Sequence, residues 1–136
     1  MKKIADIKIL DIMKKDVVHF DGKAHVFEIL RIMEEENING VPIVSEEDKV
    51  VGFVVKSDIY RFLRDLGHYP EYPVELIMSK EVHSLNENMS LLEASKLLRK
   101  ENITAVPIIN NDDELVGLIS LENIVDCFIK EYVENN

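Results

Sequence analysis

The sequence lacks three features that would each assign it to a special class. No uninterrupted apolar run reaches the roughly 18 residues that a helix needs to span a bilayer. The basic residues Lys2 and Lys3 are not followed by the apolar segment of a signal peptide. There is one cysteine, Cys127, so no internal disulfide can form. We therefore expect a chain without membrane contact in a reducing, cytoplasmic compartment.

Basic residues are also scarce. The 136 residues include 16 lysines and arginines against 26 aspartates and glutamates, which gives a net charge of −10. Such a surface repels phosphate backbones, so we expect no nucleic-acid partner. Because 46% of the residues are apolar and 31% are charged, the composition is that of a folded domain and not of a disordered chain or a coiled coil.

The sequence does contain an internal repeat. The segment NINGVPIV at residues 37–44 returns 65 residues later as NITAVPII at residues 102–109. The same shift pairs Gly52 with Gly117, and it needs no gap from residue 9 to residue 62. Two copies are too few for a solenoid, so we expect one pseudo-symmetric pair. The repeats are residues 9–62 and 74–128, and the linker between them, residues 63–73, contains helix-breaking glycine and proline.

Each repeat is expected to fold in the order strand, helix, strand, strand, helix, which makes this an α/β protein. The first copy has a strand at 17–20, an amphipathic helix at 24–36, a valine-rich hairpin at 41–44 and 49–55, and a helix capped by Ser57 or Asp58. The second copy has strands at 82–85, 106–109 and 115–119 and helices at 90–101 and about 121–132.

This doubled pattern resembles a tandem pair of CBS domains, also called a Bateman module. The likeness rests on INGVPIV (38–44) followed by VGFVVKSDI (51–59), with the counterparts ITAVPII (103–109) and VGLISLENI (116–124). The resemblance implies two pseudo-symmetric β-α-β-β-α units packed through their small sheets. It also implies a regulatory, non-catalytic module that binds an adenosine-containing ligand (AMP, ADP, ATP or S-adenosylmethionine) in the clefts between the copies.

The family pattern points to a small set of polar positions. A glycine near the end of the third strand is followed at +3 by Thr or Ser and at +6 by Asp, which hold the phosphate and the ribose. After Gly52 these positions carry Val55 and Asp58, and after Gly117 they carry Ser120 and Asn123. A carboxylate accepts from two adjacent hydroxyls, whereas an amide has one accepting oxygen. We therefore expect the site with Asp58 to bind more tightly.

Further candidates surround these positions. Lys56 is the one cation in either glycine-to-acid stretch, so a monophosphate or an adenosyl ligand is favoured over a triphosphate. By the same resemblance Asn39 and Thr104, three residues before each proline, would face a phosphate. The small Gly40 and Ala105 would let adenine approach the backbone. The remaining ligand-site candidates are Ser57 and four valines that would sandwich the purine: Val17, Val41, Val82 and Val106.

Each candidate also has a plainer explanation. Asp58 suits the positive end of a helix without any ligand, Ser120 is a good capping residue, and the valines are core residues by default. His19, Asp21 and His25 lack a third nitrogen or sulfur ligand, so we expect no metal site. No triad spacing or phosphate-cradling glycine run indicates an enzyme. The alternative function is a ligand-free assembly module that kept the fold and the dimer surface.

Apolar helix residues further predict a homodimer. The last helix of each repeat carries more of them than a small sheet can cover: Ile59, Phe62, Leu63 and Leu66 in the first copy, and Ile124, Phe128, Ile129 and Val133 in the second. We expect Cys127, on the same helix, to be buried and unreactive. The sequence identifies neither the ligand nor the effector protein or fused domain that would respond to it.

Overall fold

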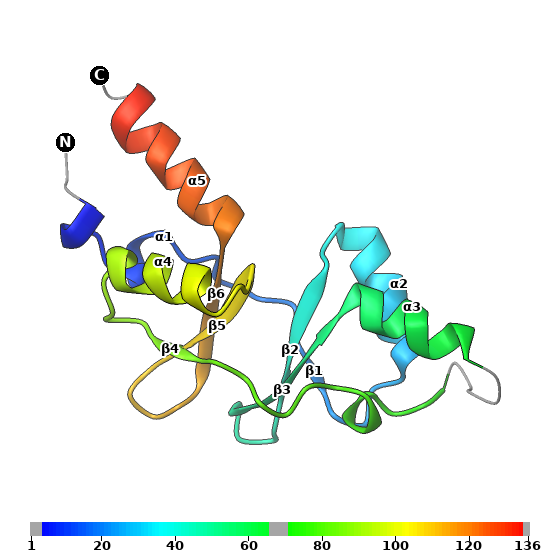
Figure 1. Cartoon of the computed structure of the whole chain (residues 1–136). Coiled ribbons are helices and arrows are strands. Elements are labelled where there is room, and N and C mark those ends of the chain that lie inside the picture. Colours follow the sequence, from blue (N-terminus) through cyan, green and yellow to red (C-terminus); the bar gives the residue numbers. More distant parts are fainter. Residues whose placement is uncertain (1–3, 66–70, 135–136) are drawn as a thin grey trace. The chain divides into compact units, whose positions relative to one another are not determined.

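The computed structural model describes residues 4–65 and 71–134, which form two compact units (Figure 1). The central unit is Val18–Val82. The terminal unit combines the chain up to Val17 with the chain from His83 onward. Each unit is mixed α/β around one three-stranded sheet, which confirms the predicted fold class. Residues 66–70 of the predicted linker, including Leu66, lie outside the described residues.

The two sheets have the same topology and register. In the central unit, β1 (Phe20–Asp21) pairs in parallel with β2 (Gly40–Val44), which forms an antiparallel hairpin with β3 (Val50–Val55). The terminal unit repeats this arrangement with β4 (Leu85–Asn86), β5 (Ala105–Ile109) and β6 (Leu115–Ser120). The sequence repeat is thus preserved in the hydrogen bonding.

Two main helices accompany each sheet. They are α2 (Val26–Glu36) and α3 (Lys56–Arg64) in the central unit, and α4 (Leu91–Lys100) and α5 (Leu121–Ile129) in the terminal unit. A π-helical turn, η3 (Lys130–Glu134), prolongs α5, and the short elements are α1 (Ile9–Ile12) and the 3-10 turns η1 (Ile4–Asp6) and η2 (Val74–Leu76). After α2 and after α4 the chain turns through an asparagine with a φ of 55°, a left-handed conformation that asparagine adopts at low cost.

Two local predictions were wrong. The strands β1 and β4 begin at Phe20 and Leu85, three residues later than predicted, because only the last residue of each predicted strand pairs with the neighbouring strand. Neither Ser57 nor Asp58 caps α3. Instead β3 runs directly into the helix, and the N-cap residue is Val55, which has no side-chain cap.

Each unit has its own apolar core, and each core contains residues from both repeats. We call residues 9–17 and 74–82, the first part of each repeat, its lead-in. Ile9 and Met13 are buried in the core of the terminal unit, whereas Val74 is buried in the core of the central unit. Each unit therefore combines the body of one repeat with the lead-in of the other.

A methionine and a glycine hold each lead-in against its sheet. A Cβ atom placed on Gly117 would overlap the Sδ atom of Met13, and one on Gly52 would overlap the Sδ atom of Met78. Beside each methionine the lead-in forms a backbone bridge with the sheet. In the terminal unit Lys14 and Leu118 exchange two hydrogen bonds of 2.9 and 3.0 Å. A side chain at either glycine would therefore force the methionine to shift from its place in the core.

The exchange of lead-ins predicts which fragments fold. A fragment of residues 18–82 contains a complete core, so we expect a helical circular-dichroism spectrum and cooperative unfolding. A fragment of residues 9–65 is a complete repeat by sequence, but it lacks Val74, Ile77 and Met78, which pack in the same core. Each well-buried apolar side chain contributes about 1.5–3 kcal/mol, a large part of the stability of a small domain. We expect this fragment to stay unfolded as a monomer; cooperative monomeric unfolding of both fragments would contradict the exchange.

Candidate functional site

The predicted site residues gather in two equivalent sets, one in each unit. In the central unit the amide of Lys56 donates to the backbone oxygen of Asn39 at 2.7 Å, and Gly40 is the register partner of Val55. In the terminal unit the amide of Leu121 donates to the backbone oxygen of Thr104 at 3.0 Å, and Ala105 is paired with Ser120. Each set therefore lies where the last strand of a sheet passes into a helix.

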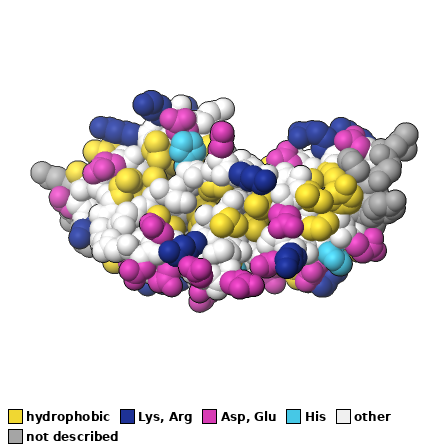
Figure 2. All heavy atoms as spheres, turned by 90° about the horizontal axis from the view of Figure 1, so that it is seen from below, with side chains coloured by type: hydrophobic (Ala, Val, Ile, Leu, Met, Phe, Trp, Pro, Cys, Tyr) yellow, Lys and Arg dark blue, Asp and Glu magenta, His cyan; other side chains and the backbone are white. Residues whose placement is uncertain are grey.

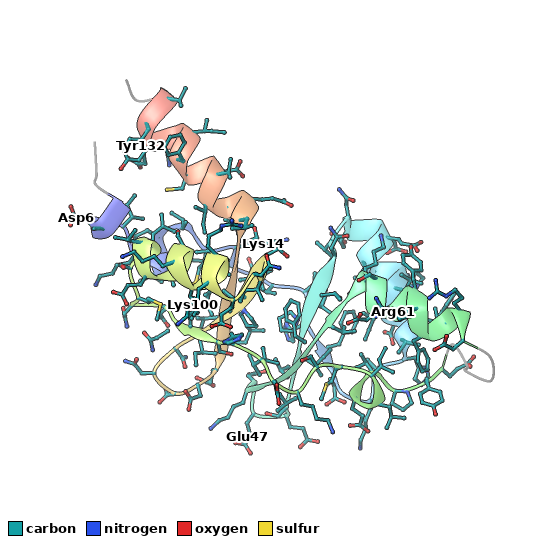
Figure 3. The ribbon with its side chains drawn as sticks, viewed as in Figure 1. Asp6, Lys14, Glu47, Arg61, Lys100 and Tyr132 are labelled. Carbon is teal, nitrogen blue, oxygen red and sulfur yellow. The ribbon has the colours of Figure 1, made fainter. Side chains whose placement is uncertain are left out.

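The central set contains a carboxylate in the first turn of α3. Asp58 is half-buried, and its Oδ1 accepts a 2.8 Å hydrogen bond from Nη1 of Arg61, one turn further along the helix. Arg61 is labelled on α3 in Figure 3. The side chains are 45% exposed for Asp58 and 62% exposed for Arg61, so the ion pair adds little stability.

The predicted cation is not directed at that carboxylate. The Nζ of Lys56 lies 5.9 Å from the centroid of the Tyr60 ring, a cation–π distance. The Tyr60 hydroxyl in turn donates to Oε1 of Glu34 on α2 at 2.8 Å. This hydrogen bond, with smaller contributions from desolvation and the charge of Glu34, raises the pKa of Tyr60 above its usual value. Lys56 and Asp58 therefore have separate contacts.

Gly40 has a structural reason to be glycine. A Cβ atom at this position would lie 2.8 Å from Cε1 and 3.0 Å from Cζ of the Phe53 ring on β3. An aromatic ring over a strand glycine is a recurrent packing arrangement in sheets. In the terminal unit the equivalent residues are Ala105 on β5 and Leu118 on β6. Alanine is larger than glycine and leucine is smaller than phenylalanine, so the two changes compensate in size. The approach of an adenine to Gly40 stays a prediction.

The terminal set is closed by hydrogen bonds of its own. The Ser120 hydroxyl accepts from the amide of Asn123 at 3.2 Å and donates to Oδ1 of Asn123 at 3.0 Å. The amide of Ser120 also donates to that Oδ1, at 2.9 Å. This is a capping box at the start of α5, and it confirms the capping interpretation of Ser120. The accepting oxygen of Asn123 thus already takes two hydrogen bonds.

The two units differ here because of one side chain. Val55 starts α3 without a hydroxyl, so Asp58 is not drawn into a cap, whereas Ser120 starts α5 and engages Asn123. Sequence reasoning treated the +3 and +6 positions as two independent contacts with a ligand. It missed that the two side chains can bind each other, although the spacing Ser-x-x-Asn was a recognisable sign of this.

The valines divide into two groups. Val41 and Val106 have no exposed surface and are core residues. Val17 and Val82 are half-buried, and each is the last residue of a lead-in, where the chain passes from one unit to the other. Of the other candidates, Asn39, Ser57 and Thr104 are exposed and Ala105 is half-buried.

A metal site, a membrane-spanning helix and the single cysteine are the remaining features to consider in the described part of the chain. Residues 4–65 and 71–134 contain no group of three His, Cys, Asp or Glu side chains placed to hold a metal ion. The same residues include no helix that is long and apolar enough to cross a membrane. Cys127 is half-buried rather than buried. Desolvation, together with the charge of Glu131 and against that of Lys130, raises the pKa of its thiol, which disfavours the reactive thiolate.

Comparison with known proteins identifies the family. The sequence pattern of the CBS domain matches residues 9–65 and again residues 74–130, so the chain belongs to the CBS domain family. It is 36% identical to the inosine-5'-monophosphate dehydrogenase of Aquifex aeolicus over 74% of its own length, but it spans only 20% of that enzyme.

Solved structures agree with this assignment. The CBS domain pair of protein MJ0100, in complex with 5'-methylthioadenosine and S-adenosyl-L-methionine, superposes with a TM-score of 0.80 at 27% identity and covers 91% of this chain and 97% of that one. The AcuB protein from Vibrio cholerae superposes with a TM-score of 0.86 at 26% identity over 96% and 97% of the two chains. The chain is therefore similar in fold along nearly its whole length to tandem CBS pairs.

The capping box predicts an unequal effect of two serine substitutions. Ser120→Ala removes the cap of α5, so the free energy of unfolding should fall by about 1 kcal/mol. Ser57→Ala is the matched control, because Ser57 is exposed and lies inside the first turn of α3 without a capping role. Its effect should stay within about 0.5 kcal/mol. Urea denaturation of both variants measures the difference, and equal effects would mean that Ser120 does not cap α5 in solution.

Proposed function

We propose that this chain is a non-catalytic regulatory module that binds an adenosine-containing ligand, with its tighter site at the start of α3. The observation that carries the proposal is Asp58. This carboxylate lies half-buried in the first turn of a helix whose start has no side-chain cap. A carboxylate so placed can accept hydrogen bonds from the two hydroxyls of a ribose. The complex of the MJ0100 pair with two adenosyl compounds supports this ligand class.

The hydrogen bonds already present at each site support this inequality. In the central unit Asp58 bonds through Oδ1 to Arg61 in an exposed pair that adds little stability, so a ribose can displace that contact at low cost. In the terminal unit, the corresponding oxygen is engaged by Ser120, so a ribose there would have to compete with the capping box. We infer a strong and a weak site.

The same chain is proposed to act as a homodimer in the reducing cytoplasm. A conformational or rigidity change on ligand binding would be read by an effector protein or a fused domain. On the face shown in Figure 2, acidic side chains are interspersed with the lysines and arginines, and the net charge is −10, which is unfavourable for nucleic acid.

The rival is a ligand-free assembly module, and one observation favours it. The Ser120–Asn123 box and the Asp58–Arg61 pair satisfy polar groups without any ligand. A thermal-shift screen with S-adenosylmethionine, 5'-methylthioadenosine, AMP, ADP and ATP separates the two functions. A ligand at 100 times its Kd stabilises the folded protein by about 2.7 kcal/mol, so at least one compound should raise the melting temperature. No shift with any of the five would favour the assembly module.

A second experiment tests the inequality of the sites. A charge-assisted hydrogen bond contributes about 1.5–3 kcal/mol, against about 1 for a neutral one. Asp58→Ala should therefore weaken the tighter site about tenfold or more, whereas Asn123→Ala should leave that site unchanged. Isothermal titration calorimetry with the best compound from the screen measures both variants. If Asp58→Ala binds as well as the native chain, Asp58 is a structural residue and the site lies elsewhere.

A further inference from the structure

The two methionines that hold the lead-ins make the same contact but differ in exposure. Sδ of Met78 lies where a Cβ atom on Gly52 would stand, and Met13 makes the equivalent contact with Gly117. Met13 is 8% exposed, whereas Met78 is half-buried and packs against the side of the central core. A small reactant in the solvent therefore reaches the lead-in of the central unit more readily than the lead-in of the terminal unit.

This exposure matters because a thioether reacts with peroxides. One oxygen atom passes from hydrogen peroxide to the sulfur: an S–O bond forms, the O–O bond breaks, the sulfur is oxidised by two electrons and the peroxide is reduced to water. Methionine sulfoxide is polar and chiral where the thioether was apolar, so the change disrupts packed cores. Methionine sulfoxide reductases reverse the oxidation, so the modification can act as a switch.

The core beside Met78 also takes up residues that were predicted to form a dimer surface. Ile59 is buried, and Phe62 and Leu63 pack against the same core, so this half of the predicted surface was wrong. In the second repeat Ile124 packs against the terminal core. The residues exposed there are Phe128, Ile129 and Val133. Around Met78 the central core thus offers apolar side chains, and a sulfoxide oxygen buried among them would lose the hydrogen bonds that it makes with water.

The contact of Met78 with Gly52 is one of two that join this lead-in to β3. Beside it, the amide of Phe53 donates to the backbone oxygen of Ser79 at 3.0 Å, and the amide of Ser79 donates to the backbone oxygen of Phe53 at 2.9 Å. β3 is an outer strand of its sheet, so the bridge covers the edge opposite β2. A sulfoxide that turns toward water leaves Gly52, and the bridge then rests on its two hydrogen bonds alone.

The same part of β3 leads to the candidate site. The ring of Phe53 lies against Gly40, with Cε1 2.8 Å from the place of a Cβ atom there. Two residues later β3 ends at Val55, and α3 begins with Lys56 and contains Asp58 in its first turn. A lead-in released from β3 would therefore loosen the strand that positions both Gly40 and the start of α3.

We propose that Met78 is an oxidation site: a peroxide converts it to the sulfoxide, and the sulfoxide releases the second lead-in from β3. Met13, which makes the same contact from a buried position, stays reduced under the same conditions, so the switch acts on the central unit. Weaker ligand binding beside Asp58 follows from the release, and only this last step rests on the proposed function.

Peptide mapping of the full chain during mild oxidation with hydrogen peroxide tests the site. Mass spectrometry should find one added oxygen on Met78 before Met13 and the fully buried Met33 react. The mapping also separates this product from any oxidation of Cys127, the half-buried thiol of the terminal unit. If Met13 reacts as fast as Met78, the difference in exposure does not select a site and the proposal is wrong.

Amide hydrogen exchange of the oxidised chain tests the release. The amides of Phe53 and Ser79 should exchange at least about tenfold faster than in the untreated chain. Lys14 and Leu118 are the matched control, because their amides form the equivalent bridge in the terminal unit, and their exchange rates should not change. Treatment with methionine sulfoxide reductase should restore the original rates. Oxidised Met78 with unchanged exchange at Phe53 and Ser79 would overturn the release.

Two leucine variants assign the effect to one sulfur atom. Met78→Leu keeps an apolar side chain of similar volume without an oxidisable sulfur. Met89→Leu is its control, because Met89 is also half-buried but packs against the terminal core. Oxidation should lower the melting temperature of the native chain and of Met89→Leu by about 4 °C or more, and it should leave that of Met78→Leu unchanged. An equal loss in Met78→Leu would contradict the switch.

Calorimetric titration of the best adenosyl compound into the untreated and the oxidised chain separates the switch from the proposed function. Weaker binding after oxidation would support both. If no compound binds the untreated chain, the proposed function fails, whereas the mapping and the exchange rates still decide whether Met78 is an oxidation site. Equal affinity in the two states, with faster exchange at Phe53 and Ser79, would overturn the link between the lead-in and the ligand site.

Discussion

The structure depends on the close contact between a lead-in methionine and a sheet glycine in each unit. The thioether of Met13 lies over Gly117 and that of Met78 over Gly52, at positions where any side chain would overlap it. Through these contacts each lead-in contributes to the core and adds a backbone bridge to the sheet. The β3 and β6 strands that carry these glycines run directly into α3 and α5. The candidate ligand residues therefore stand on strands that the other repeat holds in place.

The sequence repeat was sufficient to predict most of the secondary structure. A constant shift of 65 residues, valine-rich hairpins and amphipathic helices correctly indicated the order of elements, because those patterns are local and occur twice. The exchange of lead-ins was not predictable in this way. Ile12-Met13 and Ile77-Met78 are equivalent in both copies, so the sequence contains no signal that says which core each pair enters. The structure shows the outcome, with Met13 against Gly117 and Met78 against Gly52.

The candidate site was predicted in part for a similar reason. The hairpins and the helices after them were predicted from the sequence, and at their junctions the structure brings Asn39 beside Lys56 and Thr104 beside Leu121. Ligand binding at these junctions stays a prediction. What side chains do at the junction depends on their immediate neighbours. Val55 cannot form a hydrogen bond with Asp58, which bonds to Arg61 instead, whereas Ser120 bonds to Asn123. Asp58 and Asn123 are equivalent positions, but their hydrogen-bond partners therefore differ. A family motif gives the positions but does not show which polar groups are already satisfied.

The exchange of lead-ins has a consequence for the origin of the chain. A protein with a single such repeat could complete its core only by receiving the lead-in of another molecule, as in a domain-swapped dimer. Its folding would then depend on concentration. Duplication and fusion turn the same contacts into contacts within one chain, so that the supply of each lead-in no longer depends on the protein concentration. Once both lead-ins belong to the same chain, the two copies can diverge in sequence. Val55 in one copy and Ser120 in the other then give the two junctions different hydrogen bonds.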